Sequence, residues 1–106
     1  MKQPHNYHVY IVTNSKKSVF YTGVSNDLER RIIEHWQNRG NPKTFAGLYH
    51  CYNLIYYEHY HNIHNAITRE KEIKSWRRQK KLELARSLNP ELKFYNKDLC
   101  GNWPPL

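Results

Sequence analysis

The first quarter of the chain alternates apolar and polar residues in a way that predicts a β-hairpin. Residues 7–12 and 19–22 are rich in aromatic and β-branched side chains, the composition of half-buried strands. Between them, residues 14–18 form a polar, five-residue connection. Gly23 follows the second run, where we expect the backbone to turn tightly as the strand ends.

Helical spacing replaces this alternation after residue 25. Asn26 with Glu29 three residues later matches a capping box, which predicts a helix running to about Asn38. The segment 37–50 is rich in Gly, Asn and Lys, so it is expected to be an exposed loop with a short helical turn at 44–48.

The second half of the chain predicts one more strand and a long helical stretch. Residues 53–57 form a continuous aromatic and β-branched run, interpreted as a third strand at the centre of the sheet. Asn65 is expected to cap a helix that breaks near residues 78–80 and resumes through Leu88. Asn89-Pro90 ends it, because the residue before proline disfavours the α conformation. The predicted element order is β-β-α-(α)-β-α-α.

Length and charge limit the kinds of protein this can be. A chain of 106 residues corresponds to one domain, 1–106, with a single modest core. The net charge of +8 and a pI near 9.6 favour a polyanionic partner, most simply nucleic acid. A mean hydropathy of −0.95 excludes a membrane-spanning helix. We expect a cytoplasmic protein, with Cys51 and Cys100 as free thiols.

One face of the first predicted helix carries two residues that are unusual on a packing face. Arg31 and His35 are four residues apart and share a face with Leu28 and Ile32. A buried guanidinium needs a partner, and a phosphate bound bidentately is one. Alternatively, Arg31 extends past the apolar face or pairs with an acidic residue.

Glu70 falls on the apolar stripe of the later helical stretch, formed by Ala66, Ile73, Leu84 and Leu88. A carboxylate in that position is rarely buried without a partner. A divalent cation is one candidate, and a salt bridge, for example to Arg31, is the other. Glu72 lies away from the stripe, which favours Glu70 as the metal ligand.

The segment 69–81 carries seven basic and two acidic residues, and Trp76 lies among them. Such a basic stripe suits a phosphate backbone, although a solvated helix face around a packed tryptophan would show the same pattern. The candidate nucleic-acid-binding residues are Lys71, Lys74, Arg77, Arg78, Lys80 and Lys81.

Other residue groups carry weaker signals. The histidines at positions 50, 59, 61 and 64 suggest zinc, but no cysteine pair or recurring ligand spacing supports a zinc site. Tyr10 and Tyr21 lie in alternating strands, where aromatic residues usually belong to the core.

Taken together, these residues resemble the GIY-YIG nuclease domain, and most closely its small stand-alone bacterial members. Val9-Tyr10 matches the end of the first motif, and Tyr21-Thr22-Gly23 matches the second. Residues 26–35 resemble the family's arginine helix, Glu70 occupies the place of the metal-binding glutamate, and Asn89-Pro90 matches a polar position in the last motif. The resemblance covers residues 7–99.

The resemblance implies an α+β (α/β sandwich-like) fold in which helices flank a small central three-stranded antiparallel sheet. It also implies one divalent ion per site, Mg²⁺ or Mn²⁺, held by Glu70. Tyr10 would act as general base or orient the attacking water, and Tyr21 would hydrogen-bond the water or a phosphate oxygen. Arg31 would stabilise the charge that develops on the phosphate.

Two further roles and one departure follow from the same resemblance. His35 would assist proton transfer, and Asn89 would orient a neighbour of the metal or simply stop the helix. A base role for Tyr10 requires its pKa to fall from roughly 10, and we expect Arg31 and a metal ion to lower it. His8 stands where the family name has glycine, a departure from the motif that bears on activity because His8 could crowd the site.

The expected function is metal-dependent endonucleolytic hydrolysis of DNA, directed by structure more than by sequence, in repair or recombination. DNA is favoured over RNA as the substrate, with no membrane partner. Dimerisation or a partner protein would supply specificity, because one small domain offers little surface for reading bases. The alternatives are a catalytically silent DNA- or RNA-binding module and a protein-interaction domain for an acidic partner.

Overall fold

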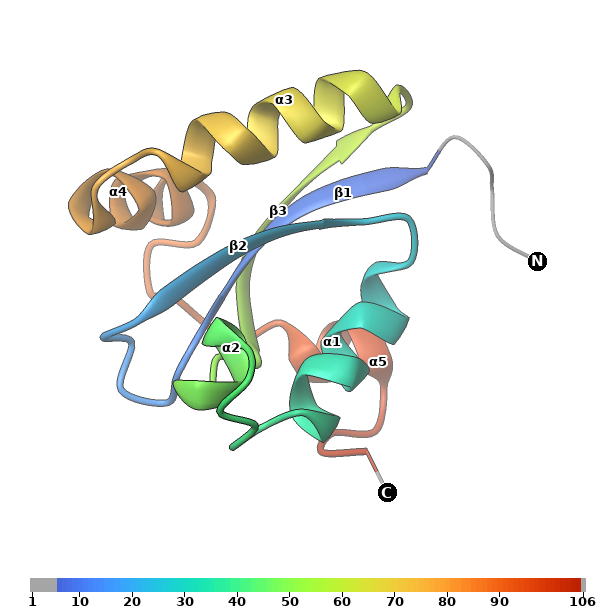
Figure 1. Ribbon diagram of the computed structural model, residues 1–106, viewed down its shortest axis with the longest axis vertical. Helices are drawn as coiled ribbons and strands as arrows, with labels where there is room; N and C mark the ends of the chain where they lie inside the picture. The colour runs from blue at the N-terminus through green and yellow to red at the C-terminus, as the bar shows by residue number, and fades with distance from the viewer. Residues whose placement is uncertain (1–5, 106) are drawn as a thin grey trace.

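The computed structural model describes residues 6–105, and residues 1–5 and 106 of the predicted domain lie outside this part. A three-stranded sheet separates two layers of helices (Figure 1). Helices α3 and α4 cover one face, and α1, α2 and α5 cover the other. The elements are β1 (Tyr7–Thr13), β2 (Phe20–Ser25), α1 (Leu28–Gln37), α2 (Phe45–Leu48), β3 (Asn53–Tyr60), α3 (Ile63–Lys74), α4 (Arg78–Leu88) and α5 (Asn96–Cys100).

All strand pairs are antiparallel, and the spatial order is β2-β1-β3. This confirms the predicted fold class and the hairpin, but the prediction that residues 53–57 form the central strand is wrong. Strand β1 is central because it hydrogen-bonds both neighbours, whereas β3 pairs with β1 alone. Both β2 and β3 are therefore edge strands, and the free edge of β2 becomes important for the site.

Alternate residues of β1 build two cores. Val9 and Ile11 pack with α3 and α4, while Tyr10 and Val12 pack with α1, α2 and α5. All four side chains are fully buried, as expected for a central strand covered on both faces. Tyr10 is thus a core residue, as the alternation predicted.

Two helices begin at residues other than the predicted caps. Asp27, not Asn26, caps α1, because its carboxylate accepts the N–H of Arg30 at 3.2 Å. Helix α3 begins three residues earlier than expected, because the Asn62 side chain accepts the N–H of Asn65 at 3.3 Å. Both caps satisfy helix N–H groups that have no intrahelical partner.

The long helical stretch is divided at residues 75–77, slightly before the predicted break. It ends before Asn89-Pro90 as predicted. Leu84 and Leu88 therefore lie on a separate helix and do not continue the stripe of Ala66 and Ile73; Leu88 is 69% exposed. The short helix α5 was not predicted.

Gly23 does not mark the end of a strand; it lies within β2, opposite Tyr10. A Cβ at this position would collide with the Tyr10 hydroxyl and ring. Glycine is needed here because the phenol of Tyr10 lies directly against the backbone of β2.

Candidate functional site

The Tyr10 hydroxyl lies between the side chains of Arg31 and His35, two residues of α1. Arg31 Nε donates to Tyr10 Oη at 3.3 Å, and His35 Nε2 lies 2.7 Å from the same oxygen. A buried hydroxyl proton needs an acceptor, and arginine is only a donor. The Tyr10 hydroxyl therefore donates to His35 Nε2, which leaves the ring proton of neutral His35 on Nδ1.

Burial sets the protonation of this pair. Burial raises the pKa of Tyr10, and this outweighs the opposing effect of Arg31. Arg31 does lower the pKa of Tyr10, as expected, but the expected net fall does not occur in the protein alone because the phenolate would be buried. Burial, followed by the charge of Arg31, lowers the pKa of His35 to about 4. At neutral pH, Tyr10 is a phenol and His35 is an uncharged proton acceptor.

A cavity of about 170 Å³ opens beside this pair. At ~30 Å³ per water molecule, it has room for a phosphate group together with water. Arg31 and His35 reach it from α1, and Tyr21 reaches it from β2, with its ring centroid 5.5 Å from that of His35. The described residues that line this cavity include no carboxylate; they are Tyr21, Arg31, His35, Asn38, Thr44, Phe45 and Ala46. We call it the inner cavity.

Arg31 is not isolated in this cavity. Its Nη1 also lies 3.2 Å from Glu34 Oε1, and its side chain is 35% exposed. Helix spacing predicted that the face carrying Arg31 packs inward, and Leu28, Ile32 and His35 are indeed buried on α1. The guanidinium thus joins a buried phenol to a half-exposed carboxylate, and its charge remains within reach of the cavity.

Glu70 lies on α3, in the helix layer on the opposite face of the sheet from α1. Its side chain is only 15% exposed, and its carboxylate pairs with Lys74 Nζ at 3.3 Å, so its ion pair is with Lys74 and not with Arg31. Lys74 Nζ in turn lies 5.5 Å from the ring centroid of Tyr21. The negative charge of Glu70 is also close enough to act on the pKa of Tyr10. Tyr10, Tyr21, Arg31 and His35 therefore lie together, whereas Glu70 is not among the described residues that line the inner cavity and is linked to this group through its partner Lys74.

The carboxylate of Glu70 is a suitable ligand for the divalent ion that the resemblance implies. Mg²⁺ is usually held by one or two carboxylates, with water and substrate phosphate completing its shell. Glu70 supplies one carboxylate, and the ammonium of Lys74 already occupies a cation position beside it. Among residues 6–105, no three His, Cys, Asp or Glu side chains are grouped to hold a metal.

The candidate nucleic-acid-binding residues do not form one continuous stripe, because α3 ends at Lys74 and α4 begins at Arg78. Arg78 Nη1 donates to the Ser18 carbonyl at 2.6 Å, which ties α4 to the hairpin turn. Lys81 is half-buried, and burial together with the charge of Lys74 lowers its pKa. Lys71 and Arg77 are exposed, and Lys80 Nζ lies 4.3 Å from the ring of Trp76.

A second cavity of about 210 Å³ lies where α4 meets the hairpin, lined by Ser18, Val19, Phe20, Phe45, Arg78 and Lys81. We call it the outer-strand cavity. Phe45 lines this cavity and the inner cavity alike. Phe45 was not among the candidate residues predicted from the sequence. The sequence pointed to this region only through the short helical turn expected at residues 44–48, which the structure confirms as α2.

Asn89 and His8 do not line the inner cavity. Asn89 is buried, and its side chain bonds the backbone of Ile55 and Lys93 at 2.9–3.0 Å, which supports the helix-stop interpretation. The ring of His8 packs edge-on against Tyr57 and His59 of β3, on the side of β1 away from β2. His8 therefore does not crowd the Tyr10 hydroxyl.

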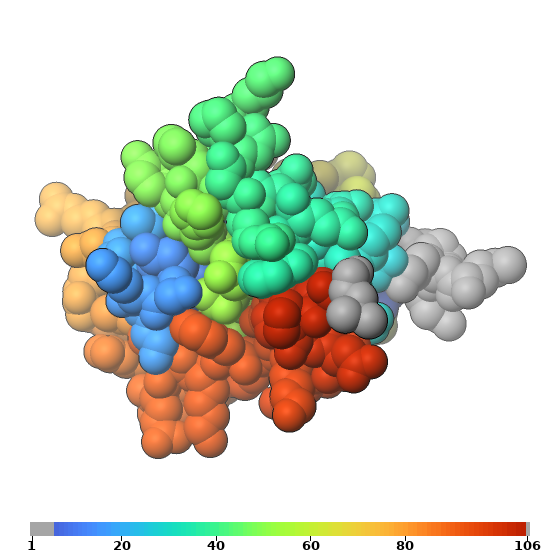
Figure 2. All heavy atoms as spheres, turned by 90° about the horizontal axis from the view of Figure 1, so that it is seen from below, coloured from blue at the N-terminus to red at the C-terminus, as the bar shows by residue number. Residues whose placement is uncertain are grey.

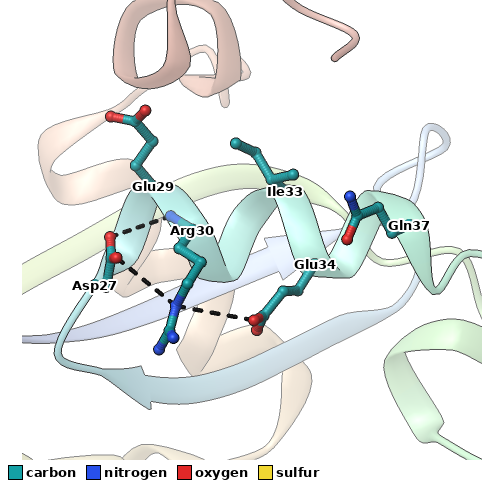
Figure 3. A pocket seen from close by; sticks show the side chains of 6 residues that line it. All are labelled: Asp27, Glu29, Arg30, Ile33, Glu34 and Gln37. Carbon is teal, nitrogen blue, oxygen red and sulfur yellow. Dashed lines mark hydrogen bonds and ion pairs between the residues drawn. The ribbon is translucent and has the colours of Figure 1, made fainter. Parts of the chain in front are cut away.

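The outward face of α1 carries a different pocket (Figure 3). Its lining residues are Asp27, Glu29, Arg30, Ile33, Glu34 and Gln37. Arg30 Nε lies 3.7 Å from Asp27 and 3.8 Å from Glu34. With three acidic residues around one arginine, this pocket does not suit a phosphate.

The chain belongs to the GIY-YIG family: the family model described as the GIY-YIG catalytic domain matches residues 6–83. That match includes the residues of both cavities and stops before Asn89. A UPF0213 protein of Staphylococcus saprophyticus is 38% identical over 78 residues, which cover 74% of this chain and 92% of that protein. A UPF0213 protein of Staphylococcus aureus is 41% identical over 76 residues, covering 72% and 89% respectively.

No solved structure gives a significant match to this chain. In the described part of the chain, no helix is long and apolar enough to cross a membrane. Membership of the family supports a nuclease-type function that acts on nucleic acid.

Proposed function

We propose that this protein is a Mg²⁺-dependent DNA endonuclease whose reacting phosphate lies in the inner cavity. One observation carries the proposal: Arg31, Tyr21 and His35 line one cavity, and no carboxylate is among the described residues that line it. Glu70 pairs with Lys74, whose Nζ lies 5.5 Å from the ring centroid of Tyr21. An arginine in such a cavity is suited to a phosphate oxygen. Glu70 is suited to the divalent ion, which supplies Lewis-acid stabilisation of the leaving oxygen when bound.

Proton transfer in this proposal runs through the Tyr10–His35 pair. Tyr10 Oη accepts the proton of the attacking water while its own proton passes to His35 Nε2, 2.7 Å away. His35 is uncharged at neutral pH because its pKa is about 4, so its Nε2 lone pair is available, but the same low pKa makes it a weak base that holds the proton only transiently. This relay avoids a long-lived buried phenolate, which the raised pKa of Tyr10 makes costly.

Arg31 also has a second proposed role, which is to control the access of water to the Tyr10 hydroxyl. Tyr10 is fully buried, and the Arg31 guanidinium bonds its hydroxyl on the cavity side. A phosphate in the cavity competes for that guanidinium. When Arg31 turns to the phosphate, the Tyr10 hydroxyl is uncovered for water.

The test is nicking of supercoiled plasmid and of branched DNA with Mg²⁺, using Glu70→Gln and Glu72→Gln as a matched pair on α3. Glu72 is an exposed residue that pairs with Arg69, so Glu72→Gln should leave the rate near that of the wild type. Glu70→Gln should abolish nicking. Wild-type nicking by Glu70→Gln would show that the metal assignment is wrong.

The buried Tyr10 also supports a second candidate, binding of nucleic acid without cleavage. In that case, binding weakens steeply as salt rises, while neither Mg²⁺ nor Mn²⁺ produces nicks in any DNA. Salt-dependent binding accompanied by Mg²⁺-dependent nicking would exclude this candidate.

A further inference from the structure

Helix α2 exposes large apolar side chains beside the inner cavity. Phe45, Leu48 and Tyr49 are 51%, 47% and 45% exposed, although such groups usually avoid water. In the space-filling view, the green segment that includes α2 stands on the surface next to the teal α1 and the blue hairpin turn (Figure 2). Clustered exposed apolar residues commonly mark binding surfaces.

The aromatic rings of this surface are continuous with the site. Phe45 stacks on Tyr21 with ring centroids 6.3 Å apart and planes inclined by 28°. Tyr49 lies against Phe45 with a centroid distance of 4.9 Å. Tyr21 lines the inner cavity, so an aromatic surface leads directly out of it.

The backbone that carries these rings is well supported despite the small size of α2. Thr44 Oγ1 accepts the N–H of Gly47 at 3.0 Å, and Gly47 O accepts the N–H of Gly40 at 2.8 Å. A Cβ on Gly47 would come within 2.6 Å of the Asn41 carbonyl, so the turn is packed tightly against the loop before it. A surface fixed in this way loses little conformational entropy when it binds a ligand.

Phe45 separates two cationic cavities. The inner cavity on one side contains Arg31, and the outer-strand cavity on the other contains Arg78 and Lys81. Within residues 6–105, no carboxylate lines either cavity. An exposed aromatic ring between two cationic cavities is complementary to a nucleotide strand, in which each base lies between the phosphates on its two sides.

We propose that Phe45, supported by Tyr49, stacks on one unpaired base of a DNA strand whose flanking phosphates lie in the two cavities. The inference rests on the proposed function, because it takes the inner cavity as the site of the reacting phosphate. Bases in a duplex have their faces covered by neighbouring bases, so a ring can stack only on a base that has left the stack. The protein therefore prefers single-stranded, flapped or mismatched DNA over a perfect duplex.

Charge decides between DNA and a protein ligand for this surface. An apolar peptide would suit Phe45 and Leu48, but it would bring no negative charge to the cationic cavities on both sides of Phe45. A DNA strand satisfies the ring and the cations together.

The experiment measures binding of a short single-stranded DNA containing one 2-aminopurine, and of the same strand in a duplex, with EDTA present to prevent cleavage. Stacking on an aromatic ring quenches 2-aminopurine fluorescence. Phe45→Ala should weaken single-strand binding by about 5-fold to 100-fold, the loss typical of one base–aromatic stack, and remove the quenching. Binding of the duplex should stay near wild type.

Two further variants act as controls. Phe45→Trp keeps an aromatic face and should keep both affinity and quenching. Leu48→Ala removes an equally exposed side chain from the same helix, one that lines neither cavity, and should change neither. If thermal unfolding shows that Phe45→Ala is misfolded, Phe45→Leu removes the ring while retaining an apolar side chain.

Single-strand binding that is indifferent to Phe45→Ala and Phe45→Leu would overturn the inference, as would an equal loss for duplex and single strand. Failure of the proposed function has a different signature. If wild-type protein quenches 2-aminopurine but nicks no DNA with Mg²⁺, the stacking surface stands and the cleavage proposal fails. If it nicks DNA and Phe45→Ala changes neither binding nor quenching, the stacking surface alone is refuted.

Discussion

Two adjacent arginines of α1 face opposite environments. Arg30 lies in the outward pocket between the carboxylates of Asp27 and Glu34, and its side chain is 63% exposed. Arg31 lies in the inner cavity against the buried hydroxyl of Tyr10. One position along the helix turns a side chain by about 100°, which is enough to exchange an acidic, solvated pocket for a phenol-lined one.

The difference shows that the groups around an arginine determine whether its charge is available to a ligand. Arg30 has its charge balanced locally by two carboxylates in water, where such pairs contribute little. Arg31 shares Glu34, but its other partner is a neutral phenol. Of these two arginines, Arg31 is the one that offers positive charge to a ligand in an enclosed space. Four experiments test this contrast.

The largest expected effect is on DNA cleavage by the two alanine variants. Arg31→Ala should reduce the nicking rate roughly 10²- to 10³-fold, the typical loss for one charge-stabilising donor in a nuclease-like site. Arg30→Ala should nick plasmid at close to the wild-type rate. Equal losses for both variants would remove the distinction between the two sides of α1.

The next effect concerns stability and pH at His35. Its pKa is about 4 in the folded protein against 6.5 for an ordinary histidine, so the unfolded chain binds the proton more tightly. The free energy of unfolding should therefore fall as pH drops from 6.5 to 4, by roughly 2–3 kcal/mol in all, at ~1.36 kcal/mol per pKa unit. Denaturant titrations across this range measure the fall.

His35→Gln provides the control for that measurement. Glutamine can still accept the Tyr10 hydroxyl proton but does not titrate, so the pH dependence between 6.5 and 4 should flatten. If the free energy of unfolding of His35→Gln still falls with pH as steeply as that of the wild type, another group causes the fall. His8 would be a candidate, because burial also lowers its pKa.

A smaller effect is expected in the salt dependence of DNA binding. Lys81 lines the outer-strand cavity, where a phosphate contact would release a counterion. Lys81→Ala should reduce the slope of log affinity against log salt concentration by about 1. Arg30→Ala removes one positive charge from the outward pocket and should leave the slope unchanged; matching slopes for the two variants would indicate a nonspecific charge effect.

The smallest effect is expected at Glu34, which both arginines contact at 3.2–3.8 Å. Glu34→Gln removes half-exposed ion pairs, so the free energy of unfolding should change by only about 0.3–0.5 kcal/mol. DNA affinity should rise slightly, because Arg31 loses its competing carboxylate. A fall in DNA affinity would show that Glu34 holds Arg31 in the orientation that binds DNA.

The local pattern of the sequence was sufficient for much of the fold. Alternation at residues 7–12 and 19–22 predicted the hairpin, and the approach of a proline predicted the end of α4 at Leu88. The helix starts were less predictable, because neighbouring residues compete as caps. Asp27 caps α1 next to the equally suitable Asn26, and the choice depends on how the chain leaves β2.

The candidate site was predictable only in part. Helical spacing correctly placed Arg31 and His35 on one inward face, and the stripe correctly marked Glu70 as a shielded carboxylate. Spacing could not show that Glu70 pairs with Lys74, or that burial would raise the pKa of Tyr10. Phe45 was missed because a four-residue helix has no periodicity from which its exposed face could be inferred.

By itself, the sequence determined the strands, most of the helices, the excess positive charge and the family motifs, because each depends on residues close together in the chain. The tertiary structure alone decided that β1 is central, that Glu70 pairs with Lys74, and that Phe45 lies between two cationic cavities. Each of these arrangements depends on how the strands, helices and side chains pack in three dimensions. Their distances are set by how helices pack on the two faces of the sheet, which short-range spacing along the chain does not encode.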